Sequence, residues 1–152
     1  EISLGLVGSE MCIRDRYRND MEGGQTNEFR PLILVAEDDD SNFKLIKAII
    51  GKKCDIQWAK NGEEIVALFK EYGKEAKAIL MDIKMPVMNG LDATKIIREE
   101  NKEIPIIMQT AYAFSSDKEN AMNAGASEVL VKPITLSILR GTLTKYFPEL
   151  VW

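Results

Sequence analysis

The stretch "AILMDIKMPVMNG", residues 78–90, begins as a buried strand and ends in loop residues. Its first four residues, 78–81, are continuously apolar, which is typical of a strand covered on both faces. Asp82 follows directly, and Pro86, Asn89 and Gly90 then mark a loop and the start of a new element. A carboxylate therefore stands at the end of a predicted core strand, where its charge requires a reason.

Apolar strands and amphipathic helices alternate along the chain from Pro31 onward. The pattern predicts five strands, at 32–36, 55–59, 78–81, 105–109 and 128–131. It predicts five helices, at 41–50, 61–72, 90–100, 115–124 and 135–147. Five βα units without hairpin signals predict an α/β fold, in which helices cover both faces of a doubly wound, five-stranded parallel sheet.

Capping residues support these helix limits. Either Asp40 or Ser41 is expected to cap the first helix, and Thr135 the last. Asn61, with Glu64 three residues later, forms a near capping box for the second helix. Gly51 and Gly125 are predicted C-caps of the first and fourth helices.

Composition limits the classes of function. Hydrophobic residues make up 45% of the 152 residues and charged residues 29%, which fits one globular domain. A net charge of -4 gives no reason to expect binding to nucleic acid or to an anionic membrane. Cys12 and Cys54 lack metal or redox spacing, which favours a reducing cytoplasm. The absence of histidine excludes histidine metal sites, Ser-His-Asp catalysis and a phosphohistidine on this chain.

The first thirty residues differ from the rest of the chain. Residues 1–30 show no sustained period and include the polar, glycine-bearing stretch "NDMEGGQTNEF" (19–29). They are predicted to be a disordered linker or a non-native extension, without a signal peptide. Residues 31–148 are the predicted folded domain, and 149–152 a C-terminal tail.

Polar side chains follow four of the five predicted strands. Parallel strands end at one edge of the sheet, where ligands of such folds bind. The acidic run 37–40 follows the first strand, Asp82 the third, Thr110 and Ala111 the fourth, and Lys132 the fifth. The second strand contributes nothing comparable. Each feature alone is more simply a cap, a turn or a helix start, but their coincidence at one edge favours function.

This set of side chains suits phosphoryl chemistry. Carboxylates held together repel one another unless a cation lies among them, and Mg²⁺ prefers such oxygen ligands. A lysine can contact a phosphoryl group and a threonine hydroxyl can donate to it. An aspartate can act as the nucleophile toward phosphorus and form an aspartyl phosphate. We therefore expect Asp82 to be presented to a phosphoryl donor.

The chain resembles the receiver domain of two-component response regulators from Pro31 to about Phe147. The resemblance rests on "ILVAEDDDSNFKLI", "AILMDIKMPVMNGLDATKIIRE", "PIIMQTAYA" and "EVLVKPI", all in order. It implies a flavodoxin-like sheet with strand order 2-1-3-4-5. Asp82 would be the phosphoacceptor, and Mg²⁺ would bind Glu37, Asp38, Asp82 and the backbone carbonyl of Lys84. The acid pair is set at 37–38 because Asn42 then occupies its place in the "ED-x-x-x-N" pattern.

The same resemblance implies the phosphoryl contacts. Thr110 would be the switch hydroxyl, the backbones of Lys84 and Ala111 would contact the phosphoryl group, and Lys132 would be the lysine often followed by a cis proline. Val129 departs from the pattern, because many receivers carry Tyr or Phe there. Switching by an aromatic side chain is therefore in doubt, although Tyr112 or Phe114 could cover the same surface.

The style of the motifs is most similar to receivers at the C-terminus of hybrid sensor histidine kinases, with a free single-domain regulator as the alternative. The implied partners are a histidine kinase or a histidine phosphotransfer domain, and a phosphorylation-dependent homodimer is compatible with the family. Two other classes stay open. A haloacid dehalogenase-type phosphohydrolase would require a second acid at the position of Lys84. A degenerate receiver would serve only as an interaction module.

Overall fold

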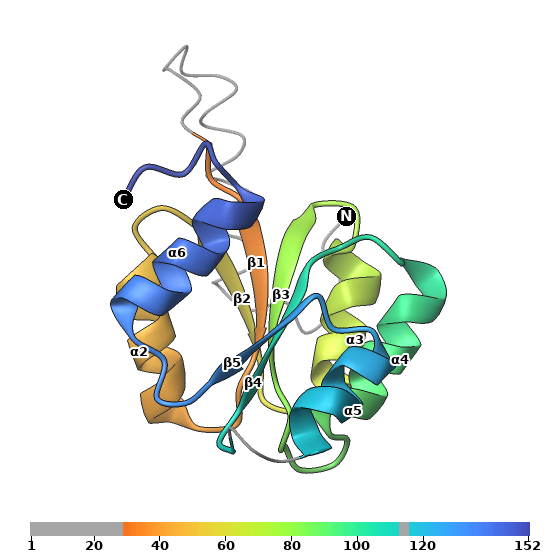
Figure 1. The fold of residues 1–152 in the computed structure, drawn as a ribbon. Coiled ribbons are helices and arrows are strands. Elements are labelled where there is room, and N and C mark those ends of the chain that lie inside the picture. The colour runs from red at the N-terminus through yellow and green to blue at the C-terminus, as the bar shows by residue number, and fades with distance from the viewer. Residues whose placement is uncertain (1–28, 113–115) are drawn as a thin grey trace.

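A computed structural model describes residues 29–112 and 116–152, in which one parallel sheet forms the centre (Figure 1). The five strands lie in the order β2-β1-β3-β4-β5, which confirms the predicted fold class and strand order. They are β1 (Leu32–Ala36), β2 (Asp55–Ala59), β3 (Ala76–Asp82), β4 (Ile106–Thr110) and β5 (Glu128–Val131).

Helices cover both faces of this sheet, with α2 and α6 on one side and α3, α4 and α5 on the other (Figure 1). Their bounds are α2 (Asp40–Ile50), α3 (Gly62–Tyr72), α4 (Gly90–Glu100), α5 (Ser116–Ala124) and α6 (Leu136–Tyr146). None of these helices has both the length and the hydrophobicity that a membrane span requires.

The sheet separates two hydrophobic cores, and strand position explains the sequence patterns. In β1, Leu32 and Leu34 pack toward α3 and α4, whereas Ile33 and Val35 pack toward α2 and α6. Every residue of β1 is buried, because central strands of a parallel sheet are covered on both faces. The edge strand β2 instead alternates between buried and half-buried residues. Continuous apolar runs in the sequence therefore mark the central strands.

Several predicted limits shift by one or two residues. The third strand is longer than predicted but ends at Asp82, as the site requires. The fourth strand begins at Ile106 because Pro105 has no backbone N–H for the ladder, and it ends at Thr110. The predicted cap of the first helix was wrong: Asp39, not Asp40 or Ser41, is the N-cap, and its side chain accepts hydrogen bonds from the N–H groups of Ser41 and Asn42.

The other predicted caps are confirmed. Asn61 and Thr135 accept hydrogen bonds from the third residue of α3 and of α6 respectively. Gly51 follows α2, and Gly125 follows α5 with a φ of 116°, which favours glycine.

Contacts extend slightly beyond the predicted domain. Phe29 lies 6.1 Å from Phe147 between ring centroids, and Arg30 forms an ion pair with Asp55 at 3.2 Å. In the predicted tail, Leu150 is buried and the Trp152 indole N–H donates to Thr144 Oγ1 at 2.8 Å. Residues 1–28, which contain most of the predicted linker, lie outside the described residues.

Candidate functional site

The strand ends bring three predicted acids together at one edge of the sheet. Glu37 and Asp38 follow β1, and Asp82 is the last residue of β3. One carboxylate oxygen from each lies within 4.8 Å of the other two. Glu37 and Asp82 are buried, whereas Asp38 is exposed. The three acids line a cleft of about 260 Å³ together with Lys84, Thr110, Ala111 and Lys132, as the sequence predicted.

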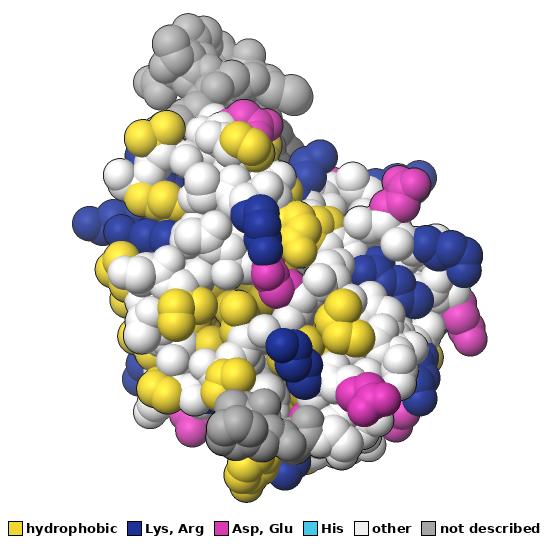
Figure 2. Space-filling view, viewed as in Figure 1, with side chains coloured by type: hydrophobic (Ala, Val, Ile, Leu, Met, Phe, Trp, Pro, Cys, Tyr) yellow, Lys and Arg dark blue, Asp and Glu magenta, His cyan; other side chains and the backbone are white. Residues whose placement is uncertain are grey.

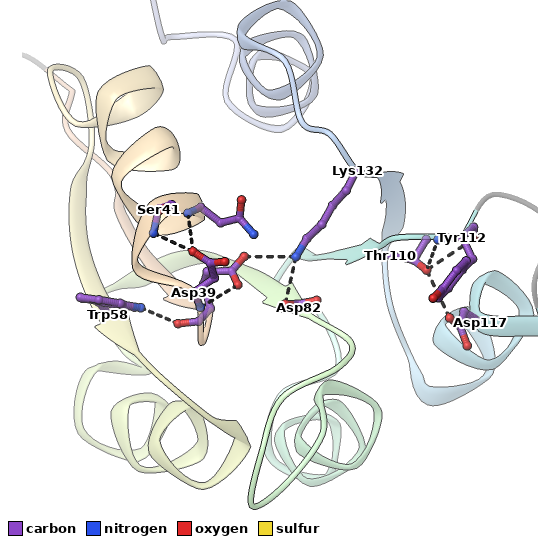
Figure 3. Close-up of polar contacts among 10 residues, drawn as sticks. Asp39, Ser41, Trp58, Asp82, Thr110, Tyr112, Asp117 and Lys132 are labelled. Carbon is purple, nitrogen blue, oxygen red and sulfur yellow. Dashed lines mark hydrogen bonds and ion pairs between the residues drawn. The ribbon is translucent and has the colours of Figure 1, made fainter.

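Lys132 supplies a positive charge to this group of acids (Figure 3). Its Nζ lies 3.0 Å from Asp82 Oδ2 and 3.4 Å from Glu37 Oε1. Burial lowers the pKa of the Lys132 ammonium, but its hydrogen bond and attraction to Asp82, with Glu37 adding to them, raise the pKa overall. The lysine therefore stays charged, and the peptide bond that follows it, Lys132–Pro133, is cis. We call Glu37, Asp38, Asp82 and Lys132 the acidic wall of the cleft.

The single positive charge of Lys132 does not fully compensate the negative charges of Glu37, Asp38 and Asp82. Burial and the nearby charge of Asp82 raise the pKa of Glu37 to about 7, although Lys132 and the backbone N–H of Asp39 lower it. A further cation among these oxygens would favour the ionised form of Glu37. An acid-rich cleft with an exposed carboxylate, Asp38, fits Mg²⁺, which binds carboxylates and retains water ligands.

Asp39 lies outside the group of acids, which supports setting the acid pair at 37–38. Its Oδ1 accepts hydrogen bonds from the N–H groups of Ser41 at 2.7 Å and Asn42 at 3.2 Å. The Asp39 side chain is therefore committed to capping α2. Asn42 itself lines the cleft.

The loop after Asp82 is held by a close backbone approach. Gly90 donates its N–H to the carbonyl of Ile83 at 2.8 Å. A Cβ built on Gly90 would lie 2.1 Å from the carbonyl oxygen of Asp82, so a larger residue would displace the end of β3. Asn89 caps α4 through the N–H of Asp92. The "NG" of the opening stretch therefore fixes the loop that begins at Asp82.

The opposite side of the cleft carries Thr110, at the end of β4. Thr110 Oγ1 accepts from the N–H of Tyr112 at 3.1 Å and lies 3.3 Å from Asp117 Oδ2, to which it can donate (Figure 3). Lys84 Nζ lies 4.6 Å from the centroid of the Tyr112 ring. We call Thr110, Tyr112 and Asp117 the hydroxyl wall. The described contacts of the Thr110 hydroxyl join it to this wall and not to Asp82.

Val129, at the position where many receivers carry an aromatic residue, lies on β5 and packs partly buried against the core on the α3–α5 side. Tyr112 is 55% exposed and contacts Lys84 as described above. Phe114, the other candidate for an aromatic residue there, lies outside the described residues.

Sequence reasoning missed two residues beside the cleft. Trp58 lies on β2, to which the sequence assigned no part in the site, and its indole N–H donates to the carbonyl of Glu37 at 2.7 Å. Asp117 lines the cleft from the first turn of α5. An acid seven residues after Thr110, at the start of the predicted helix, was the only signal for it. Neither contact follows from strand ends alone.

Comparison with known proteins identifies the family of this chain. Residues 33–144 match the family described as the response regulator receiver domain. The chain is 41% identical over 129 residues to hybrid signal transduction histidine kinase I from Dictyostelium discoideum, a match that covers 77% of this chain and 7% of that protein. It is 30% identical over 120 residues to the polar-differentiation response regulator DivK of Brucella anthropi, covering 77% of this chain and 96% of DivK.

Solved structures give the same result. The receiver domain of a sensor histidine kinase from Pseudomonas aeruginosa, which has a magnesium ion coordinated in its active-site cleft, is 30% identical with a TM-score of 0.73. That match covers 79% of this chain and 99% of the other. The receiver domain of Ssk1 from Saccharomyces cerevisiae, in complex with the histidine phosphotransfer protein Ypd1, is 28% identical with a TM-score of 0.72, covering 80% and 93%. The chain therefore belongs to the receiver domain family of two-component signalling, and it resembles the receivers of hybrid histidine kinases.

Proposed function

We propose that Asp82 accepts a phosphoryl group from a phosphohistidine on a histidine kinase or a histidine phosphotransfer domain. The observation that carries the proposal is the convergence of Asp82 with Glu37, Asp38 and Lys132 in one cleft. An Asp82 carboxylate oxygen would attack phosphorus while the bond from phosphorus to the donor nitrogen breaks. The product is an aspartyl phosphate, and the electron pair of the broken bond stays on the donor imidazole.

Glu37, Asp38, Asp82 and the backbone carbonyl of Lys84 would hold Mg²⁺. When bound, this ion offsets the negative charge of the phosphoryl oxygens. The ammonium of Lys132 adds a second positive charge next to Asp82, at 3.0 Å from Oδ2. The backbone N–H groups of Lys84 and Ala111, both of which line the cleft, would donate to the phosphoryl oxygens.

Thr110 would signal the phosphorylated state. Its hydroxyl contacts Asp117 and Tyr112 in the present structure, and we propose that it turns to the phosphoryl group once Asp82 is modified. This change would alter the surface around Tyr112 and α5. Because residue 129 is valine, β5 offers no aromatic side chain there to act as the switch. We therefore propose that the hydroxyl wall carries the switch.

The donor would approach beside Lys132. A small hollow there is lined by Asn42, Leu45, Ile46, Gln109, Lys132, Pro133 and Ile134. Figure 2 shows hydrophobic side chains gathered on the side of the molecule formed by α2 and α6. Such a surface suits a partner helix that carries the phosphohistidine. We place the domain in the cytoplasm, because a histidine kinase that phosphorylates it would use the ATP of that compartment.

Intact mass after incubation with acetyl phosphate and Mg²⁺ tests the proposal. We expect the mass of one phosphoryl group to be added to the parent protein and none to the Asp82→Asn variant. A proteolytic digest would locate the modification. Unchanged modification of Asp82→Asn, or a phosphoryl group on Asp38 or Thr110, would exclude Asp82 as the acceptor.

A further inference from the structure

The end of β2 contacts the turn at Glu37 and Asp38 from the side opposite Lys132. The Trp58 indole N–H donates to the carbonyl oxygen of Glu37 at 2.7 Å, and the backbone N–H of Glu37 donates to the carbonyl of Ala59 at 2.9 Å. Both backbone polar groups of Glu37 are thus bonded to β2. Figure 3 shows Trp58 and Lys132 on opposite sides of this turn.

The indole is itself fixed in place. Its ring stacks on Phe43 of α2, with 4.0 Å between ring centroids and an interplanar angle of 1°. The Nζ of Lys60 lies 4.8 Å from the centroid of the Trp58 ring and 3.7 Å from Asp40 Oδ1. These contacts join the ring directly to Phe43 and, through Lys60, to Asp40, both of which belong to α2. The indole N–H therefore has a defined direction toward Glu37.

Fixing the Glu37 carbonyl fixes the whole peptide unit between Glu37 and Asp38, because that unit is planar. The direction of this peptide determines where the Glu37 and Asp38 side chains leave the backbone. The Glu37 side chain points toward Lys132, with 3.4 Å between Oε1 and Nζ. Small rotations of the peptide would change the spacing of the oxygens that lie within 4.8 Å of one another.

We propose that Trp58 is a positioning residue for the cation site, acting through the Glu37 carbonyl to hold the Glu37 and Asp38 carboxylates in binding geometry. The inference rests on the proposed function, since it concerns the same site. Groups that orient metal ligands without touching the metal commonly change its affinity by 10- to 100-fold when removed. Trp58 bonds to the backbone of a ligand residue, so we expect an effect at the lower end of that range.

Trp152 provides a matched control. Its indole N–H donates to Thr144 Oγ1 at 2.8 Å, and the guanidinium of Arg140 lies 5.1 Å from its ring. Trp152 thus has the same two kinds of contact as Trp58, but its indole N–H bonds to Thr144 of α6, which does not line the cleft, whereas that of Trp58 bonds to Glu37, which does. Trp58→Phe and Trp152→Phe each remove one indole N–H and retain an aromatic ring.

The test is calorimetric titration of Mg²⁺ into the parent protein, Trp58→Phe, Trp152→Phe and Asp38→Ala. We expect Trp58→Phe to weaken Mg²⁺ binding by about 10-fold and Trp152→Phe to leave it unchanged. In the Trp152→Phe protein Trp58 is the sole tryptophan, and we expect its fluorescence to change with Mg²⁺ along the same binding curve. The fluorescence of Trp152 in the Trp58→Phe protein should not respond.

Phe43→Leu is a second variant should Trp58→Phe fail to fold. It retains the indole N–H but removes the stacked ring, so we expect a smaller loss of Mg²⁺ affinity, about 2- to 3-fold. Without metal, amide exchange at Glu37 should be faster in either folded variant than in the parent. A purely structural role would lower stability without these local changes.

The outcomes separate the two proposals. If Asp38→Ala loses Mg²⁺ binding while Trp58→Phe and Phe43→Leu bind as the parent does, the role of Trp58 is excluded and the metal site stands. If Asp38→Ala binds Mg²⁺ as the parent does, the proposed metal site is wrong, and the inference falls with it. An equal loss in Trp58→Phe and Trp152→Phe would indicate a general loss of stability and would also exclude the positioning role.

Discussion

The acidic wall and the hydroxyl wall face the same cleft, yet different contacts hold them. Glu37 and Asp82 are buried, and their contacts run to β2 and to Lys132 over 2.7–3.4 Å. On the hydroxyl wall Thr110 is buried too, but its partners are more exposed, Tyr112 at 55% and Asp117 half-buried, and the contacts of Thr110 Oγ1 are 3.1–3.5 Å long. Burial strengthens electrostatic contacts and exposure weakens them. We therefore expect the acidic wall to be ready for the phosphoryl group and the hydroxyl wall to rearrange around it.

Removing the cation of the acidic wall should have the largest effect. In Lys132→Ala, Glu37 and Asp82 lose their shared partner, so we expect phosphorylation of Asp82 by acetyl phosphate to slow by about 100-fold. The metal-free protein should also lose about 2 kcal/mol of unfolding free energy, because partly buried carboxylates are left without compensation. Urea titration and intact-mass kinetics measure the two effects.

Lys145→Ala is the matched control, since Lys145 forms an exposed ion pair with Glu128 at the start of β5, and neither residue lines the cleft. We expect no measurable change in either quantity for that variant. Equal behaviour of Lys132→Ala and Lys145→Ala would show that the acidic wall does not depend on its lysine.

The next effect concerns the lifetime of the phosphorylated state. Lys84 and Tyr112 stand two residues beyond Asp82 and Thr110, and Lys84 Nζ lies 4.6 Å from the centroid of the Tyr112 ring. Neither side chain offers a carboxylate or amide to orient water. We expect slow self-dephosphorylation in the parent and about 10-fold faster decay in the Lys84→Asn, Tyr112→Glu double variant.

Loss of phosphorylated protein after removal of the donor, at constant Mg²⁺, measures this rate. Equal decay in both proteins would mean that these two positions do not set the lifetime. Decay of the parent within seconds would contradict the shielding argument, and Asp117, a carboxylate already in the cleft, would then be the first candidate for orienting water.

A smaller effect should follow from freeing Thr110. Asp117→Ala removes the acceptor 3.3 Å from the Thr110 hydroxyl and a negative charge from the cleft. A hydrogen bond of this kind contributes about 1 kcal/mol, so we expect phosphorylation to be about 3- to 5-fold faster. Asp117→Asn retains an acceptor and loses only the charge, and an intermediate rate would separate the two contributions. A slower rate in Asp117→Ala would show that the contact prepares Thr110 instead of restraining it.

The same contrast explains what the sequence could predict. Asp82, Lys132 and the acid pair are predictable because parallel strands end at one edge, so a position in the chain translates into a position in space. Trp58 and Asp117, by contrast, approach the site from the neighbouring strand β2 and from the helix α5, and not from the ends of the strands that form it. The Trp58 contact depends on β2 lying next to β1, with Trp58 opposite Val35 in the register. The Asp117 contact depends on where α5 begins.

The choice of helix cap failed for a related reason. Residues 38–41 are four successive capping candidates, and helical periodicity does not distinguish them. Asp38 belongs to the cleft, and Asp39, the next residue, has the extended backbone that a cap requires. The acid pair at 37–38 leaves Asp39 as the first acid available to the helix, so the site and the helix cap divide one run of acids.

The smallest effect on the cleft is expected from Cys54, which lies in the core shared by α2 and α6. Burial raises the pKa of the Cys54 thiol to about 12, with Arg30 lowering it and Asp55 raising it. A raised pKa in the folded state favours folding below the pKa of the unfolded thiol, near 9, and this contribution is lost as the pH rises toward 12.

At pH 8, therefore, a thiol reagent should not label native Cys12→Ser protein and should label it once in denaturant. The difference in unfolding free energy between that protein and its Cys54→Ala derivative should shrink as the pH rises above about 9. Phosphorylation of Asp82 should be the same in both, because the thiol lies in the core and does not line the cleft. Rapid labelling of the native protein at pH 8 would show that this core opens readily. The acidic wall could then not be the rigid side of the cleft.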